Sequence, residues 1–188
     1  MTYPSVAQCK VYMNITDGGD DTTIAQVLAD SIAQVERETL RTFVASAQTR
    51  NYRAVAPYVT QRKTMLTMKE DLVSVTSLTN GDGVVIAASD YQLLPVKGAP
   101  FYQIWLLPSA SVVFNIGSDG TLIALAGSFG FSAACPGDIF RVILELTDMG
   151  YASRSQGSGQ EITSRGTIID MSVWPDWMVE SVDRYVRK

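Results

Sequence analysis

The spacing of hydrophobic residues predicts helices at the beginning of the chain. Ser5 precedes a short run of apolar positions with helical spacing and is a suitable N-cap for a helix that ends near Met13. From Asp21 to Ala45, apolar residues recur every three or four positions, which predicts a long amphipathic helix. The apolar stripe of this long helix comprises Ile24, Val27, Leu28, Ile32, Val35, Leu40 and Phe43.

Between Tyr52 and Phe131 the pattern changes to short β-competent runs separated by glycine and proline. The sequence Asn80-Gly81-Asp82-Gly83 is a strong hairpin-turn signal between two such runs. Strands are expected at Leu72–Leu78, Val84–Ala88, Tyr91–Leu94, Tyr102–Leu107, Ser111–Ile116 and Thr121–Ala126.

A sheet-to-helix junction follows the last expected strand. Gly127 and Gly130 permit a bulge or sharp bend, and Pro136 suits the first position of a helix that runs to about Ala152. Residues 153–167 are polar and glycine-containing, which predicts a mobile loop. Ile168–Met171 is extended in character, and Trp174-Pro175 begins a final helix with a basic end.

These elements predict an α+β fold. We expect a helical core, formed by the long N-terminal helix and the C-terminal helices, with a central β-rich insert of short antiparallel strands. The length of 188 residues suits one domain. Its expected parts are a helical segment at 1–50, the insert at 51–131, a helix at 132–153, and a flexible loop with a terminal segment at 154–188.

Composition excludes several classes of function. No run approaches the roughly 18 apolar residues of a membrane span, and the N-terminus lacks the features of a secretory signal, so synthesis in a cytoplasm is expected. The chain has no histidine and two distant cysteines, Cys9 and Cys135. We therefore expect no metal site, no cofactor and no histidine-based hydrolase; a lysine- or carboxylate-based enzyme stays open. Buried free thiols are favoured over a disulfide.

Charge is unevenly distributed along the chain. Residues 1–40 carry two basic and six acidic side chains, and residues 70–152 carry two basic and eight acidic ones. Residues 41–69 contain no acidic residue. A basic belt between acidic segments suits charge-complementary self-association, although a solvated basic face explains it equally well. The belt comprises Arg41, Arg50, Arg53, Arg62, Lys63 and Lys69.

Two further motifs have simple structural explanations. The segment Gly127–Gly130 matches neither phosphate-binding glycine pattern and is better explained as a bend. Asp17, Asp20 and Asp21 lack the spacing of a calcium loop and are better explained as a polar turn before a helix.

Several short motifs occur together in an order that resembles a known family. They are Val11–Ile15, Asp20–Ile24, Glu36 before Arg41-Thr42-Phe43, Ser74–Leu78, Asp90–Leu93, the Gly127–Gly130 bend with its proline-started helix, and the closing Trp174-Pro175 segment. This series is similar to the head–tail connector (adaptor) proteins of tailed bacteriophages. The family usually has Gly-Arg before the phenylalanine, whereas this chain has Leu40-Arg41.

The resemblance implies a structural protein and not an enzyme. The expected assembly is a ring, dodecameric in the family, that sits beneath the portal in the virion neck and extends the DNA channel. Its expected partners are further copies of itself, the portal protein and a stopper, tail-completion or tail protein, with DNA passing through without sequence-specific binding and no membrane contact. The expected subunit interface is Arg41, Arg50, Arg53, Arg62 and Lys63, and the expected portal-docking set is Trp174, Trp177, Arg184, Tyr185 and Arg187.

Three other functions remain as alternatives. A processing enzyme requires a carboxylate cluster with metal-ligand spacing, which the sequence does not display. A DNA-binding packaging accessory would use the basic belt, but the sequence pI of about 4.8 argues against tight binding. Another neck or tail-completion protein is expected to be more completely β-structured than this chain.

Overall fold

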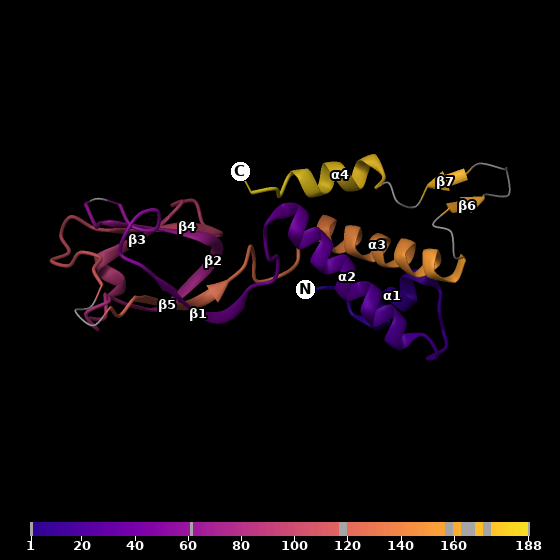
Figure 1. Cartoon of the computed structure of the whole chain (residues 1–188), viewed down its shortest axis with the longest axis horizontal. Coiled ribbons are helices and arrows are strands. Elements are labelled where there is room, and N and C mark those ends of the chain that lie inside the picture. The colour runs from indigo at the N-terminus through magenta and orange to yellow at the C-terminus, as the bar shows by residue number, and fades with distance from the viewer. Residues whose placement is uncertain are drawn as a thin grey trace. The chain divides into compact units, whose positions relative to one another are not determined.

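The computed structural model describes residues 2–60, 62–116, 120–156, 160–162, 168–170 and 174–187. The chain forms two compact units: Thr42–Ala134, which contains the main sheet, and Met1–Arg41 together with Cys135–Lys188, which contains the helices. The β-rich middle of the chain is thus one unit, and the two ends of the chain together form the other (Figure 1).

The helical unit contains α1 (Val6–Met13), α2 (Asp21–Thr39), α3 (Gly137–Gln156) and α4 (Asp176–Asp183). Both α1 and α4 pack against α2 and α3, which also pack against each other (Figure 1). Apolar residues at helical spacing form the core between these helices. Its fully buried members include Ile24, Val35, Ile139, Val142, Ile143 and Met178.

The predicted cap of the first helix is confirmed. The Ser5 hydroxyl accepts a hydrogen bond from the backbone N–H of Gln8, and the Gln8 side chain accepts one from the Ser5 N–H. This reciprocal capping box satisfies two backbone donors that a helix start would otherwise leave without partners.

The prediction of a helical core built on a long N-terminal helix is wrong, although the α+β class holds. The second helix ends at Thr39 instead of Ala45, because Leu40 adopts the left-handed conformation (φ 55°). The Arg41 N–H then donates to the Glu36 carbonyl and closes the helix end. Beyond it the chain is extended, and Val44 forms a parallel bridge with Ser132. β-branched residues after Leu40 favour this extended path over further helix.

The sheet unit contains β1 (Ser46–Tyr52), β2 (Met65–Thr79), β3 (Tyr91–Leu94), β4 (Phe101–Leu106) and β5 (Ile123–Phe129). They form one antiparallel sheet in the order β1-β5-β2-β4-β3. The β2 strand has 15 residues, so the expectation that all strands are short is also wrong. Its beginning pairs with β4 and its end with β5, so it links the β3–β4 side of the sheet to the β1–β5 side (Figure 1).

The bulge expected near Gly127 is present, but its extra residues belong to β2, the strand that pairs with β5 at this point. The register between β2 and β5 shifts twice, once between Leu72 and Ser74 and again between Val75 and Ser77. A Cβ atom on Gly127 would lie 2.2 Å from the Ser74 carbonyl oxygen. Glycine is therefore required because the two backbones approach each other too closely for a side chain.

The remaining strand predictions have mixed outcomes. The hairpin turn is confirmed, since the Gly83 N–H donates to the Asn80 carbonyl. The return run makes only a single bridge, between Thr79 and Val85, and the described part of the expected 111–116 strand is irregular. β3 has the predicted bounds, whereas β1 is not predicted by the polar sequence Ser46–Tyr52.

The segment after α3 is only partly described. The helix continues to Gln156, and β6 (Gln160–Ile162) pairs antiparallel with β7 (Ile168–Asp170). Residues 157–159, 163–167 and 171–173, on which much of the predicted loop falls, lie outside the described residues. Among the helices that the structure describes, none has the length and apolar character that a bilayer crossing requires.

Candidate functional site

The five basic residues expected at a subunit interface are divided between the two units. Arg41 belongs to the helical unit, where its Nε donates a 2.6 Å hydrogen bond to the Tyr185 carbonyl. Arg50 lies on β1, which is an edge strand, and Arg53 follows that strand. Arg62 and Lys63 lie in the turn before β2. All four basic residues of the sheet unit in this set are exposed.

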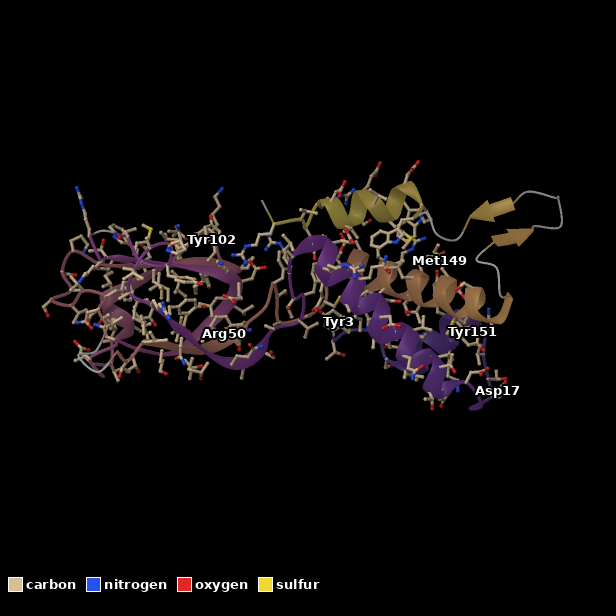
Figure 2. All side chains as sticks on the ribbon, in the orientation of Figure 1. Tyr3, Asp17, Arg50, Tyr102, Met149 and Tyr151 are labelled. Carbon is tan, nitrogen blue, oxygen red and sulfur yellow. The ribbon has the colours of Figure 1, made fainter. Side chains whose placement is uncertain are left out.

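Arg50 and Arg53 instead gather with Lys69 around a hollow of about 430 Å³ beside β1, here called the basic cavity. Figure 2 marks Arg50 on this part of the sheet unit. Its guanidinium carbon lies 5.8 Å from the centre of the Phe129 ring. The Lys69 Nζ lies 5.8 Å from the centre of the Tyr58 ring. The other lining residues are Thr49, Asn51, Tyr52, Tyr58, Glu70 and Leu122.

The basic cavity carries an excess of positive charge. Its only carboxylate, Glu70, accepts a hydrogen bond from the Tyr52 hydroxyl at 3.3 Å. Burial, and then the Glu70 charge, raise the pKa of Tyr52 above its ordinary value, so this phenol stays neutral. In the part of the chain that the structure describes, the two ion pairs are Lys10–Asp21 and Arg37–Glu38. Three cations therefore face one carboxylate without a salt bridge, and the cavity suits an anionic partner.

Lys69 is a basic residue of the cavity that was not among the residues expected at the subunit interface. It belongs to the same acid-free run of sequence as Arg50 and Arg53. The signal was therefore present in the charge pattern, but sequence alone does not reveal that β1 and β2 bring these side chains to one hollow. Arg62 and Lys63 are not among the lining residues.

The expected docking segment packs on its own unit through α4. Met178 and Val182 are buried, and the Arg141 guanidinium carbon lies 4.7 Å from the centre of the Trp177 ring. The Tyr185 hydroxyl donates a 3.0 Å hydrogen bond to Asp138. Burial, and then this carboxylate, raise the pKa of Tyr185 to about 12.

The residues expected to dock on the portal fall into two groups: those that make contacts within the helical unit and those that are accessible. The Arg187 N–H donates to the Thr39 carbonyl, so Trp177, Tyr185 and Arg187 all make contacts within the helical unit. Arg184 is exposed. Trp174 is half-buried and lines a groove of about 330 Å³. The other residues of this groove are Gln34, Glu38, Val179, Val182, Asp183 and Val186.

The outer face of α4 carries an acidic stripe that the sequence interpretation did not single out. Asp176, Glu180 and Asp183 recur at helical spacing and are all exposed. None of the three belongs to an ion pair within the described ranges. The sequence signal was the i, i+4, i+7 spacing within a helix that the Trp174-Pro175 start already predicted.

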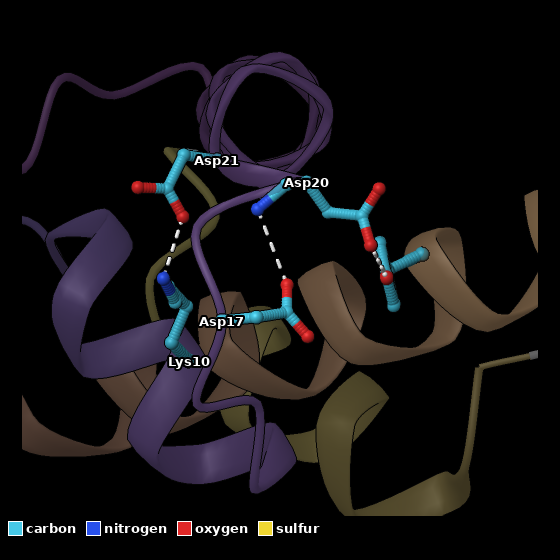
Figure 3. A network of polar contacts seen from close by, with 6 residues as sticks. Lys10, Asp17, Asp20 and Asp21 are labelled. Carbon is cyan, nitrogen blue, oxygen red and sulfur yellow. Dashed lines mark hydrogen bonds and ion pairs between the residues drawn. The ribbon is translucent and has the colours of Figure 1, made fainter.

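Asp17, Asp20 and Asp21 make polar contacts at the start of α2, as expected of a polar turn (Figure 3). Asp21 accepts a 2.6 Å hydrogen bond from Lys10, and Asp17 accepts one from the Gly19 N–H at 3.2 Å. Asp20 accepts a 2.6 Å bond from the Tyr151 hydroxyl. Among the described residues, no group of three aspartate, glutamate or cysteine side chains is arranged to hold a metal ion.

Both cysteines are buried and free, as expected. Burial raises the pKa of the Cys9 thiol, with an opposing contribution from a hydrogen bond with Thr147. Burial, and then the Asp138 charge, raise the pKa of Cys135 to about 11. Both thiols therefore stay protonated at neutral pH, which lowers their reactivity.

Comparisons with known proteins show a fold shared with chains of gene transfer agent particles. No protein-family model matches the sequence, and no curated protein matches it. A chain from the neck of an empty gene transfer agent particle, computed with C6 symmetry, is 18% identical with a TM-score of 0.63, over 96% of this chain and 87% of that one.

Two further solved structures agree with this likeness. A chain from the virion of the native gene transfer agent particle is 17% identical with a TM-score of 0.63, over 98% of this chain and 92% of that one. A chain from the native particle's neck, computed with C12 symmetry, is 17% identical with a TM-score of 0.61, over 96% and 86%. At these identities the likeness establishes a common fold that extends over nearly the whole length of both chains.

Proposed function

We propose that this protein is a structural subunit of the neck of a phage-like particle, and specifically a head–tail connector (adaptor). In this proposal the whole chain acts as one connector subunit. Copies form a ring beneath the portal, extend the DNA channel and attach the next neck or tail component. No catalytic step is part of this role.

One observation carries the proposal: a fold shared over 96% of this chain with a subunit of a gene transfer agent neck. Two of the similar structures were computed with sixfold and twelvefold symmetry. A closed ring requires a heterologous interface, in which one surface of a copy meets a different surface of the next. The separation of basic and acidic side chains on this chain suits such an interface.

The expected interaction sites remain part of this proposal. The subunit interface uses Arg50 and Arg53, which line the basic cavity, with Arg41, Arg62 and Lys63 at separate positions. Portal docking uses the terminal segment. Trp174 and Arg184 are accessible there for direct contact, whereas Trp177, Tyr185 and Arg187 hold that segment on the helical unit.

Native mass spectrometry of the purified chain, alone and mixed with the portal protein of the same particle, tests the proposal. A ring of six or twelve copies, alone or on the portal, is the expected result. A monomer that does not bind the portal protein but binds a preassembled tail would favour a tail-completion protein. Salt-dependent DNA binding by a chain that joins neither assembly would favour the packaging accessory.

A further inference from the structure

The outer face of α4 carries a charge opposite to that of the basic cavity of the sheet unit. Asp176, Glu180 and Asp183 are exposed, whereas Met178 and Val182 on the opposite side of the helix are buried in the helical unit. The helix is therefore anchored by its inner side. Its acidic stripe is presented to solvent and stays accessible when the helix is folded in place.

The basic cavity offers the complementary charge. Arg50, Arg53 and Lys69 make no ion pair within the described residues. The Tyr58 and Phe129 rings lie beside two of these cations, which limits their freedom before any partner arrives. Glu70 is hydrogen-bonded to Tyr52 and neutralises only part of the charge.

The two surfaces also agree in size. Positions 176 and 183 are separated by roughly 10 Å along a helix axis, because each residue adds about 1.5 Å. Arg50 and Arg53 are three positions apart in an extended segment, so their Cα atoms are at most about 10 Å apart. About two turns of helix therefore cover the distance between these two arginines.

We propose that the acidic stripe of one copy docks on the basic cavity of the next copy. This inference rests on the proposed ring and names both surfaces of its interface. The contact is heterologous, since the stripe belongs to the helical unit and the cavity to the sheet unit, and each copy carries both. Each copy therefore uses its stripe on one neighbour and its cavity on the other.

Neutral variants of each surface test this pairing directly. The Arg50→Gln, Arg53→Gln chain keeps the stripe but loses most of the cavity charge, and the Glu180→Gln, Asp183→Asn chain keeps the cavity but weakens the stripe. All four positions are exposed, so both chains should fold, which circular dichroism checks. We expect each chain alone to associate roughly 2- to 30-fold more weakly than the unchanged protein, because each loses two exposed ion pairs.

Mixing the two chains should restore one contact, because the intact stripe of the first chain meets the intact cavity of the second. The expected product is a one-to-one pair that does not grow, detected by native mass spectrometry. The pair should dissociate in high salt, since the Debye length falls from about 10 Å at 0.1 M to about 3 Å at 1 M. The Arg37→Gln, Lys97→Gln chain removes two exposed positive charges that belong neither to the cavity nor to the expected interface, and it should assemble like the unchanged protein.

The outcomes separate this inference from the proposed function. A mixed pair without rings of the unchanged protein would support the docking and overturn the ring. Rings of the unchanged protein without a mixed pair, or equal loss of assembly in the Arg37 and Lys97 control, would overturn the docking alone. Loss of DNA binding by the cavity variant, with its assembly unchanged, would assign the cavity to nucleic acid and also overturn the docking.

Discussion

Replacing Gly127 with alanine should destabilise the sheet unit while leaving the helical unit unchanged. The new Cβ would lie 2.2 Å from the Ser74 carbonyl oxygen and 3.1 Å from Leu72 Cδ1. The Leu72 methyl group can rotate away, but the Ser74 oxygen belongs to the backbone of β2. Relief therefore requires β2 and β5 to separate by roughly 1 Å at this point, which strains the hydrogen bonds between them.

The expected loss in the free energy of unfolding follows from two opposing contributions. Overpacking against a rigid neighbour costs about 1–3 kcal/mol, whereas alanine lowers the entropy of the unfolded chain and returns about 0.4–1 kcal/mol. We therefore expect a net loss of about 1–2 kcal/mol in the free energy of unfolding of the sheet unit. This corresponds to a roughly 5- to 30-fold increase in its unfolded fraction.

Hydrogen exchange read by mass spectrometry measures this effect separately in each unit. Peptides from β2 and β5 should exchange roughly 5- to 30-fold faster, while peptides from α2 and α3 keep their rates. Gly137→Ala is the matched control, because no atom lies within 4 Å of the added Cβ and the residue begins α3. Unchanged exchange in β2 and β5 of the Gly127 variant, or equal acceleration in the control, would refute the argument.

Three further predictions concern the helical unit. Met178→Ala should cost about 2–5 kcal/mol and expose residues 174–187 to proteolysis, whereas Val179→Ala, at a position that is 41% exposed, should leave the digestion pattern unchanged. The raised pKa of Tyr185 predicts stability that is present below pH 10 and lost as pH rises towards about 12, so urea titrations of Tyr185→Phe should show a smaller loss over that range. Cys9 and Cys135 should react with a thiol reagent only after unfolding, and their double replacement by alanine should cost roughly 1–3 kcal/mol; rapid labelling of the folded chain would contradict their burial.

Local signals in the sequence predicted the elements that depend on local chemistry. The N-cap at Ser5, the hairpin turn at Asn80–Gly83 and the bounds of β3 all follow from residues close in sequence. The end of α2 did not follow, because Leu40 takes the left-handed conformation that glycine usually adopts. Beyond this end, Val44 forms a bridge with Ser132, 88 positions later, and no local pattern reveals that pairing.

β1 is a strand that local sequence patterns also failed to predict. Its sequence, Ser46–Tyr52, is polar and has little strand character, yet all seven residues pair with β5. As an edge strand it is mostly exposed, so it lacks the alternation of apolar residues that marks a half-buried strand. Arg50 is exposed on this edge and pairs with the buried Leu125 of β5. A charge in that position also discourages unwanted pairing of the free edge.

The candidate interaction surfaces could be predicted only in part for a related reason. The charge pattern identified which residues are basic, but the cavity depends on β1 and β2 bringing Arg50 and Lys69 to one hollow. The partner surface lies more than a hundred residues later, on a helix anchored mainly by Met178 and Val182. Sequence separation does not matter to a contact between two copies, so no spacing rule within one chain connects these surfaces.

The strength of the proposed contact determines how a ring would assemble. Exposed ion pairs contribute only about 0.2–1 kcal/mol each, so three of them hold two copies weakly. A copy added to an open chain gains one such contact, whereas the copy that closes the ring gains two without further loss of rotational freedom. Closed rings are then favoured over short open chains, and a template that collects copies at high local concentration accelerates closure. We therefore expect the salt concentration that abolishes the isolated stripe–cavity pair to be lower than the concentration that dissociates an assembled ring.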